Sequence, residues 1–345
     1  MKRWHLLLEA NYLFLLTFLL SPMTVTAADI TEQLHRPLDN SVSQQSRDEA
    51  DNLVRVGEEQ LSQGNSNKAI QSWLQALGIY HSIGDLKAQG LTYDFLGKEY
   101  VQLNLLKEAE DTLRRRLAIA RDVHDFQAQI FGLNNIGSLL LQKGEPVAAS
   151  QTFGEALEIS QNLKNIEGEG LSLSNLGLAT ARLGDYNKAI KLYEAALVFR
   201  QLSGDRVAQT NTFNNAGDAY LAIGNYPDTV STYGSALQLA KTTGDRISEL
   251  RAIDGLVTAH QSVGRYERAF DLLEERLAIA NQLQNQREEL KSFESYAEIY
   301  EQMGNYPTAR NFYERAILLA RSLKDSKKEL LLIDKMNKLK KHKHK

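Results

Sequence analysis

A fixed period of 40 residues runs through most of this 345-residue chain and constrains its fold more than any other feature. A turn residue recurs at every step, at Gly64, Asn104, Gly144, Gly184, Gly224, Gly264 and Gly304. In each of the seven copies a small residue follows five positions later, except where Thr229 stands, and a large residue follows four positions after that. Such long periods are typical of arrays in which each repeat packs mainly on its neighbours. The sequence therefore predicts a repeat array rather than a globular domain.

The first half of each repeat has its own pattern, in which an apolar residue precedes a small one. Leu96-Gly97 is an example, and Tyr93 stands three residues before it. Spacings of three and four place these residues on one face of a helix. A small residue at the crossing lets two antiparallel helices approach closely. Because the second half is helical as well, we predict an all-α fold of seven helix pairs.

The combined pattern resembles the tetratricopeptide repeat (TPR), with large–x–x–Leu–Gly–x–x–Tyr in the first helix and Ala, an aromatic and Ala in the second. Tyr93, Leu96-Gly97 and Tyr100 illustrate the first part, and the resemblance covers residues 50 to 328. It implies a right-handed superhelical solenoid whose first helices line a concave groove. The period is 40 rather than 34, and the usual proline near the end of the second helix is missing. HEAT and armadillo arrays share the longer period but lack this combination of residues.

The two ends of the chain differ from the repeats. Lys2, Arg3, an apolar segment at 12–20 and small residues up to Ala28 are typical of a secretory signal peptide over residues 1–28. We predict a flexible leader at 29–48, the repeats at 49–328, and a capping helix with a Lys/His-rich tail at 329–345. The protein would then be periplasmic or secreted, and the alternative is anchoring by an uncleaved signal. The lysine-rich tail would allow peripheral contact with an anionic membrane.

Asparagine recurs on the predicted groove helices. Asn135, Asn175 and Asn215 occupy the same position in three consecutive repeats. An amide both donates and accepts hydrogen bonds, so such a ladder can bind the backbone of an extended peptide. The alternative is that these asparagines bond neighbouring helices. Two further repeat positions complete the predicted partner-binding groove. The position just before the ladder contains Asp94, Asn134, Asn214, Asp254 and Glu294, and the position three residues after it contains Lys98, Asp218 and Glu298.

Carboxylates gather in the last three repeats of this groove. They favour a partner segment with a basic and an apolar portion. Asp218, Asp254 and Glu294 are also candidate ligands for Mn²⁺ or another divalent cation, which oxygen ligands hold. The third interpretation is solvated surface charge. The chain has no cysteine, which excludes thiolate metal sites and disulfides.

No catalytic motif is present, and we do not expect an enzyme. The formal charge of −3 disfavours nucleic acid. The leading hypothesis is an exported scaffold that binds an extended protein segment, such as the tail of a membrane protein. Export, repeats and acidic residues together resemble the periplasmic TPR proteins of photosystem II biogenesis, which implies an assembly factor that handles manganese. The alternatives are a periplasmic metal-delivery protein and a general secreted adaptor.

Overall fold

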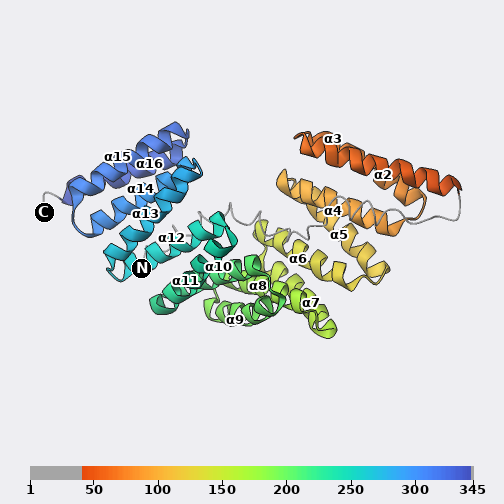
Figure 1. Cartoon of the computed structure of the whole chain (residues 1–345), viewed down its shortest axis with the longest axis horizontal. Helices are drawn as coiled ribbons and strands as arrows, with labels where there is room; N and C mark the ends of the chain where they lie inside the picture. Colours follow the sequence, from red (N-terminus) through yellow and green to blue (C-terminus); the bar gives the residue numbers. More distant parts are fainter. Residues whose placement is uncertain (1–40, 343–345) are drawn as a thin grey trace. The chain divides into compact units, whose positions relative to one another are not determined.

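The computed structural model describes residues 41–342 of the chain, and the side chains of residues 43–339. Its described part contains fifteen α-helices and no strand (Figure 1). The first helices of the seven repeats are α2 (Ser41–Ser62), α4 (Leu86–Gln102), α6 (Phe126–Gln142), α8 (Ile166–Arg182), α10 (Arg206–Ala222), α12 (Arg246–Ser262) and α14 (Gln286–Gln302). The second helices are α3 (Ser66–Ser82), α5 (Leu106–Asp122), α7 (Pro146–Leu163), α9 (Tyr186–Ser203), α11 (Tyr226–Thr243), α13 (Tyr266–Gln282) and α15 (Tyr306–Ser322). The capping helix is α16 (Ser326–His342). The predicted all-α fold of helix pairs is confirmed.

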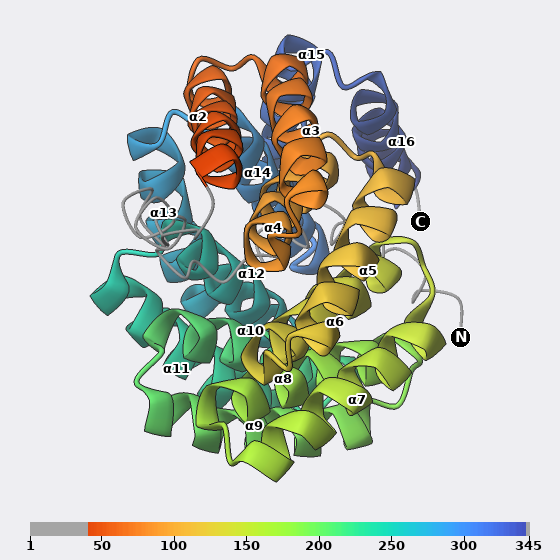
Figure 2. The ribbon, with the colours of Figure 1, turned by 90° about the vertical axis from the view of Figure 1, so that its right-hand side faces the viewer.

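The described helices form two compact units, and the chain divides between them after Asp185. In the first unit α2 to α8 pack in sequence order, so that α4, for example, contacts both α3 and α5 (Figure 2). In the second unit α9 to α16 pack in the same way. The core of each unit lies between these helices and contains the periodic residues, among them Trp73, Phe153 and Tyr313, which are fully buried.

Side-chain caps and left-handed residues set the helix boundaries. Asp85 and Asp125 each accept a hydrogen bond from the backbone N–H three residues later, as an N-cap should. The preceding residue adopts a positive φ, 72° at Gly84 and 54° at His124. This conformation ends a helix and favours glycine, although other residues occupy it in several repeats. The turn residues predicted at 40-residue intervals, from Gly64 to Gly304, likewise adopt a positive φ, so the predicted turns are confirmed.

The small residue after the apolar one permits close helix packing. A Cβ atom added to Gly137 of α6 would lie 2.5 Å from Cε1 of Phe153 on α7. No real side chain tolerates that distance, so glycine lets the aromatic ring lie directly against the α6 backbone.

Two of the predicted domain boundaries shift. Helix α2 begins at Ser41, so the prediction of a flexible leader through residue 48 is wrong for residues 41–48. The reason is Arg47, which is buried and pairs with Asp51 and, at 3.4 Å, with Asp85. The capping helix begins at Ser326 rather than 329. The signal peptide, the remainder of the leader and residues 343–345 lie outside the described residues.

Candidate functional site

The asparagines of the first unit mainly join neighbouring helices. Asn134 of α6 donates 2.9 Å hydrogen bonds to the backbone oxygen of Ile130 and to Oγ of Ser172 on α8. Asn175 of α8 donates to Oδ1 of Asn134 at 2.9 Å and is only 6% exposed. The alternative interpretation, that these amides hold helices together, therefore describes both residues.

Other side chains on the same faces remain accessible. Asn135 is half-buried, and no hydrogen bond joins its side chain to another described residue. Lys98 is exposed, and no ion pair joins it to a described carboxylate. Leu91 and Phe131 are half-buried. Asp94 is engaged, because Nε of Arg116 lies 2.8 Å from its carboxylate.

The second unit uses its predicted groove residues in internal networks. Asn214 donates to the backbone oxygen of Ser248 at 3.2 Å. Arg251 of α12 donates to Oδ1 of Asn215 at 2.7 Å and pairs with Asp218. Tyr233 also donates to Asp218, and burial raises the pKa of its phenol well above the usual value. These groups cross-link α10, α11 and α12.

Asp254 belongs to a second network centred on Arg276 of α13. The guanidinium is 1% exposed and lies 2.7 Å from Asp254 and 2.8 Å from Glu288. Burial lowers the pKa of Arg276, but the two carboxylates more than offset it, so the pKa is raised. Arg276 stands at a position that is alanine in most repeats, next to Leu273 rather than an aromatic residue, and its two ion pairs neutralise the buried charge.

Glu294 and Glu298 of α14 face the capping helix. Nζ of Lys335 lies 2.9 Å from Glu294 and 2.6 Å from Glu298, and Lys328 lies 2.6 Å from Glu294. Burial raises the pKa of Glu294, but the two ammonium groups outweigh it and lower the value overall. Burial is the main effect at Glu298 and raises its pKa. Lys328 and Lys335 of the capping helix thus neutralise the carboxylates that were expected to bind a basic segment of a partner.

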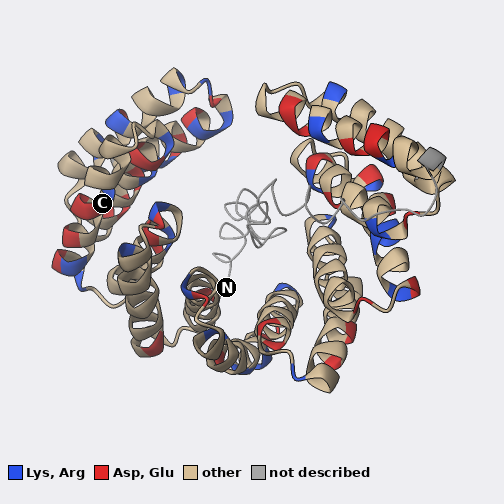
Figure 3. Cartoon of the chain, turned by 45° about the vertical axis from the view of Figure 1, so that its right-hand side comes forward, with Lys and Arg blue, Asp and Glu red and all other residues tan. Residues whose placement is uncertain are grey.

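These contacts bear on the proposed metal ligands. Asp218, Asp254 and Glu294 each pair with a cationic side chain of this chain. Within residues 41–342, no group of three or more His, Asp or Glu side chains is placed to hold a metal ion. Basic and acidic segments alternate along the helices of each unit (Figure 3). In the described part of the chain, the three candidate ligands are therefore each neutralised by a cationic side chain and are not grouped around one point.

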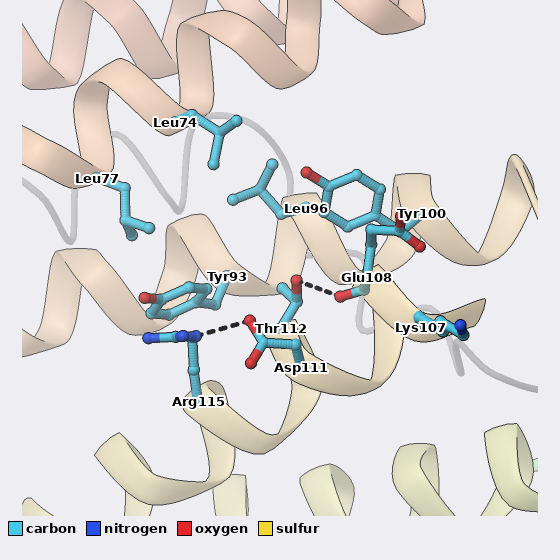
Figure 4. A pocket seen from close by; sticks show the side chains of 10 residues that line it. All are labelled: Leu74, Leu77, Tyr93, Leu96, Tyr100, Lys107, Glu108, Asp111, Thr112 and Arg115. Atoms are coloured by element: carbon cyan, nitrogen blue, oxygen red, sulfur yellow. Dashed lines mark hydrogen bonds and ion pairs between the residues drawn. The ribbon is translucent and has the colours of Figure 1, made fainter. Parts of the chain in front are cut away.

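The first unit also contains a pocket that the sequence analysis did not identify. It lies between α3, α4 and α5 and has a volume of about 540 Å³. Leu74 and Leu77 of α3 point toward Tyr93, Leu96 and Tyr100 of α4 (Figure 4). Lys107, Glu108, Asp111 and Arg115 of α5 form its rim. We call it the repeat-2 pocket. No sequence signal singles it out, because Thr112 occupies a position that is also threonine in repeats three and five.

Family models of the tetratricopeptide repeat match residues 129–202, 206–282 and 292–327, more than half of the chain. The chain belongs to the tetratricopeptide repeat family. A search of curated proteins finds no match for this TPR protein.

Several solved structures share the TPR fold. The apo form of RapI is 16% identical, with a TM-score of 0.60, and the alignment covers 81% of this chain and all of RapI. The ATPase PH0952 from Pyrococcus horikoshii, which has a tetratricopeptide repeat sensor, is 16% identical with a TM-score of 0.67, over 88% of this chain and 46% of that one. A Rap protein complexed with Competence and Sporulation Factor is 15% identical with a TM-score of 0.52, over 86% and 80%. At these identities the likeness establishes the fold alone.

No helix in the described part of this TPR protein is both long and apolar enough to cross a membrane.

Proposed function

We propose that this protein is a scaffold that binds an extended segment of a partner protein along α4 and α6. The observation that carries the proposal is the accessible set on these helices: the unbonded amide of Asn135, the unpaired ammonium of Lys98 and the half-buried Leu91 and Phe131. A TPR fold supports it, because stacked helix pairs present successive first helices as one extended binding surface.

The chemistry of this surface refines the expected partner. Amide and ammonium groups bind backbone carbonyls and carboxylates, and Leu91 and Phe131 bind apolar side chains. The partner segment would therefore combine apolar and acidic residues. The basic segment expected from the sequence is disfavoured, since Asp218, Asp254, Glu294 and Glu298 already pair with cations of this chain.

We further propose that the scaffold acts outside the cytoplasm, on the soluble tail of a membrane protein under assembly. Support comes from the signal-like residues 1–28, which lie outside the described part of the chain. A role in photosystem II assembly rests on resemblance and stays a prediction. The absence of enzymatic activity also stays a prediction.

A capture experiment with the mature chain tests the scaffold. Asn135→Ala combined with Lys98→Ala removes two polar contacts of about 1 kcal/mol each, which lowers affinity roughly tenfold or more. The measurement is capture of proteins from detergent-solubilised membranes, followed by titration of the captured partner.

The matched control places alanine in the same two columns of the second unit, Ser295→Ala with Thr258→Ala. Capture should survive in this control. Equal losses in both double variants, or none in the first, would mean that the partner does not bind along α4 and α6.

A further inference from the structure

The repeat-2 pocket has a counterpart five repeats later, between α13, α14 and α15. Equivalent residues are 200 positions apart, so Tyr93, Leu96, Tyr100, Thr112 and Arg115 correspond to Phe293, Tyr296, Tyr300, Phe312 and Arg315. On the facing helix, Ile70 of α3 corresponds to Phe270 of α13. The two sites therefore share helix positions and differ in side chains.

The counterpart is filled by aromatic rings of the chain itself. Phe312 stacks on Tyr296, with ring centroids 4.8 Å apart, and on Tyr300 at 5.6 Å. Phe270 stacks on Tyr300 from the other helix at 4.9 Å. The guanidinium of Arg315 lies 5.4 Å from the centroid of Phe312, a cation–π contact. We call this group the repeat-7 cluster.

The repeat-2 pocket has aromatic residues and an arginine at several of the same positions, but it lacks rings equivalent to Phe312 and Phe270. Thr112 and Ile70 are smaller than phenylalanine, while Tyr93, Tyr100 and the rim arginine Arg115 remain. Leu74, at the edge, is 48% exposed. A volume of about 540 Å³ falls within the range of roughly 300–1,000 Å³ found for ligand pockets. The opening thus lies where repeat seven places its own aromatic rings.

We infer that the repeat-2 pocket binds an aromatic side chain of a partner protein, in the position that Phe312 occupies in repeat seven. Tyr93, Tyr100 and Leu77 offer faces on which a ring can stack or pack. Arg115 would cover the bound ring as Arg315 covers Phe312.

The charges at the rim fit a neutral ring. Lys107 and Arg115 are balanced by Glu108 and Asp111, so the mouth has no net charge to attract an ionic group. Arg115 is held by Asp111 at 2.8 Å. Burial, followed by the nearby Glu108 carboxylate, raises the pKa of Tyr100, so this phenol adds no charge to the pocket.

This pocket is separate from the surface proposed above for the extended segment. Tyr93, Leu96 and Tyr100 lie on one face of α4, and Leu91 and Lys98 lie roughly opposite, given about 3.6 residues per helical turn. The two surfaces can therefore be tested independently, and loss of one need not remove the other.

The test titrates the full chain, labelled at its leucine methyl groups, with N-acetyl-phenylalaninamide and with N-acetyl-alaninamide. We expect saturable NMR shifts at Leu74, Leu77 and Leu96 with the phenylalanine probe only. Thr112→Phe places the ring of repeat seven in the pocket and should weaken probe binding at least tenfold. Ile70→Phe places on α3 the equivalent of Phe270, the ring that stacks on Tyr300, and it serves as the second variant if Thr112→Phe does not fold.

Thr152→Phe is the matched control, because it adds the same ring one repeat later. It should leave the leucine shifts and the probe affinity unchanged. Shifts that do not saturate, shifts of equal size with the alanine probe, or probe binding that survives in a folded Thr112→Phe or Ile70→Phe variant would each overturn the assignment.

Discussion

The repeat-2 pocket and the repeat-7 cluster are built on the same positions of the repeat, yet one is open and the other is filled. Phe312 of repeat seven and Phe270 of the preceding repeat stack on the tyrosines of α14. Thr112 of repeat two and Ile70 of the preceding repeat stand at the equivalent positions, and a pocket remains over α4. The helix positions are common to both, so the difference between an open pocket and a filled core lies in side-chain volume, above all at Thr112 and Phe312.

The comparison also separates what stabilises a repeat from what is available to a partner. Ala109 and Leu113 of α5 are buried, as are Ala309 and Tyr313 of α15. Those positions join the helices of a pair. Phe312 packs against Tyr296 and Tyr300 of the first helix of its own repeat, and the smaller Thr112 at the equivalent position leaves space over α4. A TPR array can therefore keep its fold while one of its grooves changes function.

Opening the repeat-7 cluster should give the largest effect. Phe312→Thr reproduces the residue of repeat two and removes the ring that stacks on Tyr296 and Tyr300. Because Phe312 is only half-buried, we expect a loss of about 2–3 kcal/mol in the free energy of unfolding, below the cost of a fully buried phenylalanine. Urea denaturation followed by circular dichroism measures it.

The same variant should also create a binding site. N-acetyl-phenylalaninamide should raise the free energy of unfolding of the Phe312→Thr variant. It should not stabilise the protein that retains Phe312. A variant that loses less than about 0.5 kcal/mol, within the range of ordinary surface changes, would contradict the claim that the cluster is a packed core.

The sequence was sufficient for the fold because each repeat confirms the others. Gly64 and its equivalents predict the turns, and pairs such as Leu96-Gly97 predict the helix faces. The leader was misjudged because the contacts of Arg47 with Asp51 and Asp85 depend on a neighbouring helix. Local polarity alone suggested an unstructured segment.

The candidate site was harder to predict because polar side chains choose partners across helices. Asn175 bonds Asn134 one repeat away, and Glu294 pairs with Lys328 and Lys335 of the cap. Comparing one repeat position across the seven repeats shows which polar residues recur there. It does not show which residues of a neighbouring helix will form hydrogen bonds or ion pairs with them. Comparing charge between columns of adjacent repeats, such as Asp218 with Arg251, would have indicated these pairs.

The next largest difference between the repeat-2 pocket and the repeat-7 cluster should be in stability at high pH, because the cluster has Tyr296 where the pocket has Leu96. Burial raises the pKa of Tyr296 to about 12, whereas an unfolded tyrosine ionises near 10. Its contribution is therefore present below pH 10 and is lost as the pH rises toward 12. Tyr296→Phe keeps the ring and should reduce the loss of stability between pH 9 and pH 11.5 by about 1–2 kcal/mol.

The control for this prediction is Tyr93→Phe, which removes a phenol that lines the open repeat-2 pocket. Urea denaturation at both pH values gives the comparison. An unchanged difference between pH 9 and pH 11.5 in Tyr296→Phe would place the alkaline sensitivity of the second unit at another tyrosine, such as Tyr220, whose pKa burial also raises to about 12.

The smallest effect should come from the arginines that occupy the same position at the two sites. Arg315 lies over Phe312 and Phe293, so Arg315→Ala removes an exposed cation–π contact of about 0.5–1 kcal/mol. Arg115 instead pairs with Asp111 in an exposed i,i+4 contact, and Arg115→Ala should cost only about 0.3 kcal/mol. The double-mutant cycle of Arg315→Ala with Phe312→Thr isolates the contact, because the coupling energy should equal most of the single-variant loss. Zero coupling would mean that Arg315 acts through solvation alone, and the proposed covering of a bound ring by Arg115 would lose its structural precedent.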